Sequence, residues 1–218
     1  DDGGGIDGGS DGGAPDGGAN DGGPPPPTCG PRVLIDDAFD VAGSPGWSSY
    51  EASELQLGVE DGRLKILFPS SIAAERYAFY ETATPMDLSG ACVEVDVPVV
   101  PSATTEALVY AKIIVGTRDI EMTAFGGTLY ARVRLGDVAT IIAMQPYDPI
   151  AHRHWRIRHG PAILGWDVSS DGVAWTEFAT HAEAIPVPSA TVQVGAGTYR
   201  IETGAGRAEI EHTTIRLP

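Results

Sequence analysis

The sequence predicts an all-β protein in which two antiparallel sheets stack face to face behind a short N-terminal arm. Apolar and polar side chains alternate with a period of two in many short runs, as they do in strands that bury one face. Turn residues interrupt these runs at intervals of about 8 to 12 residues, a spacing typical of a sandwich or barrel. No long stretch shows a competing helical period. A chain of 218 residues is long enough for one such core and an arm.

The arm is expected over residues 1–31 and the domain over residues 32–218. The arm repeats Asp-Gly-Gly five times and then carries four consecutive prolines, so it has almost no apolar side chain to bury. We expect disordered chain in the glycine part and extended chain in the proline part, serving as a tether. Two alternatives stay open: calcium binding by the repeated aspartates, and docking of residues 1–28 on the sheet edge of another copy.

The charge and the cysteines narrow the class of protein. The net charge is −16, and the arm accounts for six of the aspartates, which disfavours general nucleic-acid binding because phosphates need a basic surface. No run of 18 apolar residues predicts a transmembrane segment. Cys29 and Cys92 are expected to form a disulfide that pins the end of the arm, as in an extracellular or cell-surface protein. Two free thiols would instead favour an intracellular location.

The predicted strands follow one another along the whole domain. They cover residues 33–39, 47–50, 55–57, 64–68, 77–81, 92–100, 107–115, 120–124, 128–135, 140–144, 152–159, 163–168, 175–178, 192–198 and 208–217. In 92–100, for example, Val93 and Val95 face inward while Glu94 and Asp96 face outward. We expect the last strand to lie beside the first, which would bring both ends of the domain together.

The segment 152–180 carries the clearest pattern. Trp155 and Ile157 alternate with His154, Arg156 and Arg158, so one side of this strand is apolar and the other polar. In the next strand three apolar residues share one side, namely Leu164, Trp166 and Val168. A turn is expected at 169–172, where Asp-Gly supplies the positive φ angles of a tight hairpin. Beyond the turn, Trp175 and Phe178 predict a short strand whose rings cover the hairpin.

Two motifs in this segment, W-x-I-R and S-x-D-G-x-x-W, resemble the late strands of concanavalin A-like lectin/glucanase sandwiches. They comprise Trp155, Ile157, Arg158, Ser169, Asp171, Gly172 and Trp175. The resemblance implies a two-sheet antiparallel jelly roll, commonly secreted, whose non-catalytic members often bind glycans and some of whose members hydrolyse them. The motif residues are scaffold, so the resemblance brings no active site with it.

A catalytic pair is not expected. Hydrolases of the resembling family use the pattern E-x-D-x-x-E, because retention of configuration needs two carboxyl groups about 5 Å apart. The nearest match is Glu94-Val95-Asp96, where Val99 occupies the position of the second glutamate. Glu121 stands alone. The sequence therefore predicts that the protein is not an enzyme.

No cofactor is expected either. Three histidines, His152, His154 and His159, invite a zinc interpretation, but zinc needs three or four converging ligands and an unbroken strand separates these side chains. Structural calcium is an open alternative that cannot be assigned to a loop, with Asp167 and Asp171 as the nearest candidates.

One basic and aromatic group of residues predicts a binding site in an otherwise acidic chain. It comprises Tyr130, Arg132, Arg134, His154, Arg156 and Arg158. If their two strands share a sheet, the side chains form one stripe in which arginine binds carboxylate or sulfate and tyrosine stacks on a sugar. The alternative is a solvated strand face whose charges are paired.

These observations favour a secreted or surface-tethered, non-catalytic domain that binds glycan or another surface polymer. The first alternative is an extracellular structural subunit that assembles into filaments through residues 1–28. The second is a degenerate glycoside hydrolase.

Overall fold

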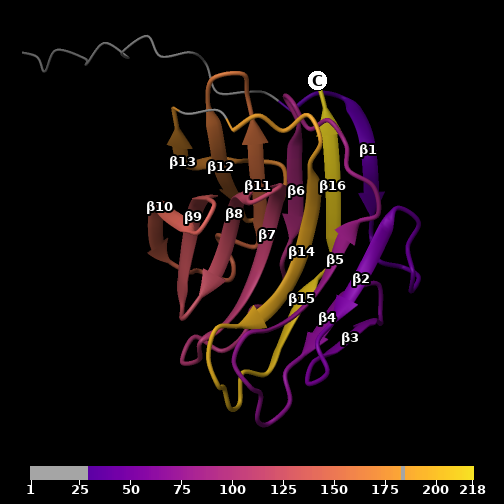
Figure 1. Ribbon diagram of the computed structural model, residues 1–218, viewed down its shortest axis with the longest axis vertical. Coiled ribbons are helices and arrows are strands. Elements are labelled where there is room, and N and C mark those ends of the chain that lie inside the picture. The colour runs from indigo at the N-terminus through magenta and orange to yellow at the C-terminus, as the bar shows by residue number, and fades with distance from the viewer. Residues whose placement is uncertain (1–28, 183–184) are drawn as a thin grey trace, which may run out of the picture.

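The computed structural model describes residues 29–182 and 185–218, and these residues form a two-sheet antiparallel sandwich (Figure 1). The all-β architecture predicted from the sequence is confirmed. Residues 1–28 lie outside the described part of the chain, and so do the predictions of a disordered tether, a calcium site and a docking segment made for them. No helix within the described ranges is long and apolar enough to cross a membrane.

One sheet has six strands and the other has seven, with a small third sheet beside them. The six-stranded sheet runs in the order β1 (Arg32–Asp37), β16 (His212–Leu217), β6 (Cys92–Asp96), β11 (His154–His159), β12 (Leu164–Ser169) and β13 (Thr176–His181). The seven-stranded sheet runs in the order β10 (Val138–Pro146), β9 (Thr128–Leu135), β8 (Arg118–Phe125), β7 (Ala107–Val115), β14 (Thr191–Thr198), β5 (Arg76–Thr82) and β2 (Trp47–Glu51). The third sheet comprises β15 (Arg207–Ile210), β4 (Leu64–Leu67) and β3 (Gln56–Val59).

The core lies between the two large sheets, where their alternating apolar side chains meet. Trp155 on β11 and Trp166 on β12 are almost fully buried there. The indole N–H of Trp166 donates a hydrogen bond of 3.0 Å to the backbone carbonyl of Glu121 on β8. This bond joins the six-stranded to the seven-stranded sheet and satisfies a polar atom that burial would otherwise penalise.

The two ends of the domain lie together, as predicted. β1 pairs with β16, and Arg32 lies opposite Leu217 (Figure 1). The predicted disulfide between Cys29 and Cys92 is confirmed, with a Cα–Cα distance of 5.4 Å. Cys92 is fully buried at the start of β6, so the bond ties the chain before β1 to the centre of the six-stranded sheet.

Most predicted strands differ from the observed strands by a few residues at an end, and two need a larger correction. The strand predicted over 208–217 is two strands, β15 and β16, which belong to different sheets, and the strand predicted over 92–100 ends at Asp96. The Glu211 N–H bonds the Asp96 carbonyl where the last segment changes sheet. The bend falls between two runs with the same alternation, so the pattern along the chain does not reveal it.

The turn after β12 also differs from the predicted tight hairpin. Only Gly172 has a positive φ in this turn, and the connection to β13 spans residues 170–175. The Asp171 carboxylate accepts hydrogen bonds from the N–H groups of Val173 and Ala174, both at 2.9 Å, and it holds the wider loop in shape. Trp175 therefore lies on this loop, at the outer face of the six-stranded sheet, and its ring does not cover the core.

Candidate functional site

The residues of the predicted basic stripe lie on two different faces. β9 belongs to the seven-stranded sheet and β11 to the six-stranded sheet, so the shared sheet that a single stripe required does not exist. Tyr130, Arg132 and Arg134 project from β9 on one outer face, whereas His154 and Arg156 project from β11 on the other. The single stripe is wrong because strand alternation fixes the side of a strand that a residue occupies, but not the sheet that the strand joins.

On the seven-stranded sheet, the outward side chains of three neighbouring strands form three cross-strand rows. Antiparallel pairing aligns Tyr110, Thr123 and Tyr130 in the first row, Lys112, Glu121 and Arg132 in the second, and Ile114, Asp119 and Arg134 in the third. Side chains directly opposite one another across antiparallel strands are close enough to interact. We call the eight polar and aromatic members of these rows the β7–β9 face; it comprises Tyr110, Lys112, Asp119, Glu121, Thr123, Tyr130, Arg132 and Arg134.

A buried carboxylate stands at the centre of the β7–β9 face. Glu121 is 1% exposed and accepts a hydrogen bond of 2.8 Å from the Arg132 guanidinium through Oε1. Its Oε2 lies 3.7 Å from the Lys112 ammonium. Because a buried charge needs compensation, the two cations account for the burial of Glu121. In the sequence Glu121 stands alone, because its partners are distant in the chain and become its neighbours only through the register of β7, β8 and β9.

Aromatic rings surround this charged centre. Lys112 lies 4.3 Å from the centre of the Tyr110 ring and Arg132 lies 5.3 Å from the centre of the Tyr130 ring. Tyr77 on β5 approaches Tyr110 edge to face, with ring centres 6.4 Å apart. It reaches there because Gly197 on β14 leaves room, since a Cβ at this position would overlap the Tyr77 ring. The Tyr110 ring is buried, whereas the Tyr130 ring is partly exposed at the surface of the face.

Several polar atoms on the β7–β9 face are buried without a hydrogen-bond partner. Six such side-chain atoms occur in the described residues, and four of them are here: Asp119 Oδ1, Thr123 Oγ1, Arg132 Nε and Arg134 Nε. Thr123 is fully buried and lies between Tyr110 and Tyr130 in the first row. Burial raises the pKa of the Asp119 carboxyl, and the neighbouring Glu121 charge raises this pKa further. The four atoms are buried within the face, and Arg134 Nε lies 3.2 Å from Asp119 Oδ2 in an ion pair, so they are not exposed to a ligand.

On the six-stranded sheet, Arg158 is buried, although the sequence predicted that it lies on the exposed, ligand-binding side of its strand. It is 4% exposed, and the buried Asp167 carboxylate accepts hydrogen bonds from its Nε at 2.5 Å and its NH2 at 2.7 Å. Arg156 donates to the same carboxylate at 2.7 Å. Two arginines thus enclose Asp167, which excludes it as the calcium ligand considered from the sequence.

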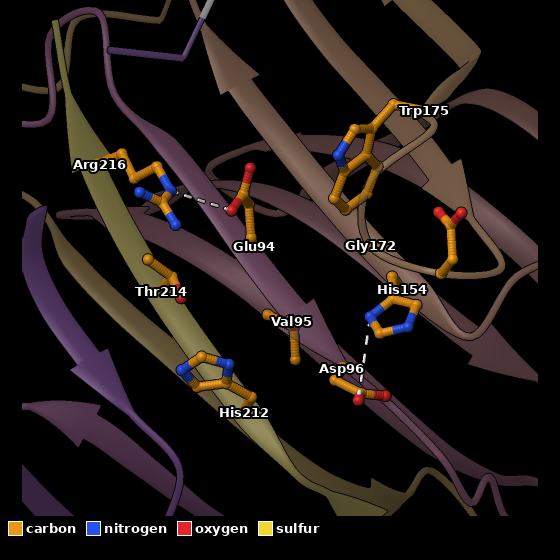
Figure 2. A pocket seen from close by; sticks show the side chains of 10 residues that line it. Glu94, Val95, Asp96, His154, Gly172, Trp175, His212, Thr214 and Arg216 are labelled. Atoms are coloured by element: carbon orange, nitrogen blue, oxygen red, sulfur yellow. Dashed lines mark hydrogen bonds and ion pairs between the residues drawn. The ribbon is translucent and has the colours of Figure 1, made fainter. Parts of the chain in front are cut away.

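Beside this ion pair, the outer face of the six-stranded sheet contains a small pocket of about 250 Å³. We call it the Trp175 pocket; it is lined by Glu94, Val95, Asp96, His154, Asp171, Gly172, Trp175, His212, Thr214 and Arg216 (Figure 2). The residues Glu94 and Asp96, the nearest match to the hydrolase pattern, therefore lie here. Both are paired, since Arg216 donates to Glu94 at 3.2 Å and Arg153 forms two bonds with Asp96 at 2.8 and 2.9 Å.

The histidines do not converge on a metal. No group of three or more metal-binding side chains occurs within residues 29–182 and 185–218. His159 is buried and accepts a hydrogen bond from the Gly90 N–H while its other ring nitrogen contacts the Ile185 carbonyl at 2.8 Å. His152 contacts the Asp148 N–H and Gln145. Each of these two rings thus has a local structural role.

Comparisons with known proteins identify the fold. No protein family and no curated protein matches the chain by sequence. A β-1,3-1,4-glucanase (lichenase) derived from a mouse hindgut metagenome matches in structure with a TM-score of 0.62 and 14% identity, over 84% of this chain and 99% of the glucanase. The κ-carrageenase of Pseudoalteromonas carrageenovora, solved with an oligotetrasaccharide of κ-carrageenan, matches with a TM-score of 0.58 and 10% identity, over 88% and 98% of the two chains.

A third similar structure is the CBM2 module of the evolved Dit protein of Lactobacillus casei BL23 phage J-1. Its TM-score is 0.61 at 7% identity, over 84% of this chain and 94% of the module. At such identities the likeness shows the fold alone. The chain has the concanavalin A-like lectin/glucanase jelly-roll fold, which confirms the fold implied by the motifs around Trp155 and Trp175.

Proposed function

We propose that this protein is a secreted or surface-tethered, non-catalytic domain that binds an acidic polysaccharide across the β7–β9 face. The observation that carries the proposal is the group of three cations, Lys112, Arg132 and Arg134, on one face of an acidic chain, next to the partly exposed ring of Tyr130. A polysaccharide offers hydroxyl groups for hydrogen bonds and flat C–H faces for stacking, so it matches both features.

The charges of the face favour an acidic polymer. Three cations, Lys112, Arg132 and Arg134, stand with two carboxylates in a chain whose net charge is −16. Arg132 is paired with Glu121 at 2.8 Å and Arg134 with Asp119 at 3.2 Å, so both guanidinium groups are held in place on the face. Carboxylate or sulfate oxygens of the polymer would bind N–H donors of these groups that the pairs do not use, since arginine binds both groups through directed N–H donors.

The state of the carboxylates supports binding without cleavage. Both oxygens of Glu121 face cations, and the side chain is too buried for a sugar oxygen or a water to reach it. The outward residues of β8 on either side of it are Thr123 and Asp119, and the Asp119 carboxylate is paired with Arg134 at 3.2 Å. A retaining glycosidase needs two accessible carboxyl groups about 5 Å apart, one of which donates a proton.

Separate observations support the proposed extracellular location of the protein and the class of polymer that it binds. The disulfide between Cys29 and Cys92 supports an oxidising compartment outside the cytosol. The lichenase and the κ-carrageenase act on polysaccharides by their names, and they show that the same fold presents a surface to such chains.

Binding to a sulfated, a carboxylated and a neutral polysaccharide, measured by affinity electrophoresis and titration calorimetry, tests the proposal. We expect retardation by dextran sulfate and alginate and little by dextran, and weaker binding as salt screens the charges. Tyr130→Ala combined with Arg134→Gln should lower the affinity about 10-fold or more, because a stacking surface and a charge are lost together.

Arg118→Gln is the matched control, because Arg118 is exposed at the start of β8, forms no ion pair among the described residues and lies outside the β7–β9 face. Equal binding of dextran and dextran sulfate, or no difference between the double variant and the control, would refute the proposal. Release of reducing ends from any of these polymers, abolished by Glu121→Gln, would show an enzyme instead.

A further inference from the structure

The Trp175 pocket lies on the opposite outer face of the sandwich from the β7–β9 face. Pairing of β16, β6 and β11 aligns His212, Asp96 and His154 in one row and Thr214, Glu94 and Arg156 in the next. The loop 170–175 adds Asp171, Gly172 and Trp175 at one side. Figure 2 shows Trp175 facing Glu94 and Arg216 across the pocket, with His154 below the ring. The pocket is therefore assembled from three strands and a loop held by Asp171.

The residues that line the pocket include both hydrogen-bond donors and hydrogen-bond acceptors. Glu94 uses Oε2 to accept from Arg216, while its Oε1 makes no hydrogen bond to the residues that the structure describes and lies 3.8 Å from Arg156. His154 is 3.9 Å from Asp96, too far for a hydrogen bond, and its ring has no nearer partner in the described part of the chain. Within residues 29–182 and 185–218, Arg216 donates only through Nε. A free acceptor, two free guanidinium nitrogens and an imidazole within one pocket suit hydroxyl groups, which both donate and accept.

Trp175 adds a platform for stacking. The Arg156 guanidinium lies 4.2 Å from the centre of the indole and covers one face of the ring. Arg156 is itself fixed by Asp167, so the ring rests on a rigid support. No aromatic residue among those described contacts the indole. Tryptophan rings bind ligands that are apolar on one side and polar at the edge, as a sugar ring is.

The size and charge of the pocket limit the ligand. Its volume of about 250 Å³ lies below the roughly 300 to 1,000 Å³ typical of sites for drug-sized ligands. The Glu94 charge is paired with Arg216 and the Asp96 charge with Arg153, so the lining presents no excess of cations. A small ligand that carries hydroxyl groups and no charge meets these conditions.

We propose that the Trp175 pocket binds one neutral sugar unit, stacked on Trp175 and hydrogen-bonded by Glu94, His154 and Arg216. This site is independent of the acidic-polymer site on the β7–β9 face, and its ligand belongs to a different chemical class. A domain with both sites would bring a neutral sugar and an acidic polysaccharide to opposite faces of the same sandwich.

Nuclear magnetic resonance titration of the full chain with glucose, galactose, mannose and N-acetylglucosamine tests this proposal. We expect at least one of them to shift the Trp175 indole and His154 ring signals with a Kd on the order of 1 mM, because a single sugar has few atoms to contribute. Trp175→Ala should weaken this binding at least 10-fold, whereas Trp175→Phe should retain most of it. Both variants should fold, since Trp175 lies on a loop outside the core.

Two controls separate this proposal from the proposed function. Tyr130→Ala should leave the sugar titration unchanged, and Trp175→Ala should leave dextran sulfate binding unchanged. The proposal is overturned if none of the four sugars shifts the two signals, if Trp175→Ala responds as the parent protein does, or if glucuronate binds more tightly than glucose. Loss of dextran sulfate binding in Tyr130→Ala bears only on the β7–β9 face.

Discussion

The buried ion pair beneath the Trp175 pocket makes a strong prediction about stability. Asp167 is 2% exposed and accepts three hydrogen bonds from Arg156 and Arg158, at distances between 2.5 and 2.7 Å. Asp167→Asn keeps the shape but removes the negative charge, so the buried Arg158 loses its main counter-charge. Breaking a buried pair in this way costs about 3 to 5 kcal/mol, because an uncompensated charge remains inside the protein.

The loss of stability in Asp167→Asn should be measurable by both thermal and chemical unfolding. For a domain of this size about 1 kcal/mol lowers the midpoint by 2 to 4 °C, so Asp167→Asn should lower it by roughly 6 to 20 °C. Glu177→Gln is the matched control, because Glu177 contacts the same Arg158 at 3.2 Å with a half-exposed side chain. An exposed pair contributes about 1 kcal/mol or less.

Urea unfolding followed by circular dichroism gives the free energy of unfolding for each variant. Adding Arg158→Met to Asp167→Asn should recover part of the loss, since it removes the stranded cation. If Asp167→Asn lowers the free energy of unfolding by no more than Glu177→Gln does, then the buried pair does not contribute the expected stability.

Three further predictions concern other parts of the molecule. Replacing Cys29 and Cys92 by alanine removes a disulfide that joins residues 63 positions apart, so the free energy of unfolding measured by urea titration should fall by about 4 kcal/mol. An unchanged unfolding midpoint would contradict a stabilising role for this disulfide. Binding of dextran sulfate should strengthen as the pH falls from neutral through the raised pKa of Asp119, because protonation removes a negative charge from the β7–β9 face while sulfate stays ionised, and Asp119→Asn should abolish this dependence in calorimetry. Because the pKa of Asp119 is raised in the folded state, its neutral form stabilises the folded protein. This stabilisation is complete at pH values below the ordinary pKa of 3.8 and is lost as the pH rises through the pKa of the folded state. Gly197→Ala should cost about 1 to 3 kcal/mol and weaken polymer binding, because its Cβ displaces the Tyr77 ring; wild-type stability and binding would argue against that packing.

Local features of the chain determined much of the fold. The alternation predicted that Trp155 and Trp166 face the core, although it did not predict the burial of Arg158, and the pattern of β9 predicted the outward positions of Tyr130, Arg132 and Arg134. These predictions held because a strand places successive side chains on opposite faces whatever its neighbours are.

Contacts between distant segments decided the rest. The sequence predicted one stripe containing Arg132 and Arg156 if their strands shared a sheet, but β9 and β11 lie in different sheets. It described Glu121 as isolated, although the register of β7, β8 and β9 places that residue between Lys112 and Arg132.

By itself the sequence determined the class of fold, the disulfide and the inward or outward position of most strand residues, because these follow from local alternation and from composition. Only the tertiary structure decided which outward residues become neighbours: the three rows of the β7–β9 face, the arginines around Asp167 and the lining of the Trp175 pocket. The physical reason is that the order and register of strands are set by packing of the whole core, and no segment of the chain encodes them alone.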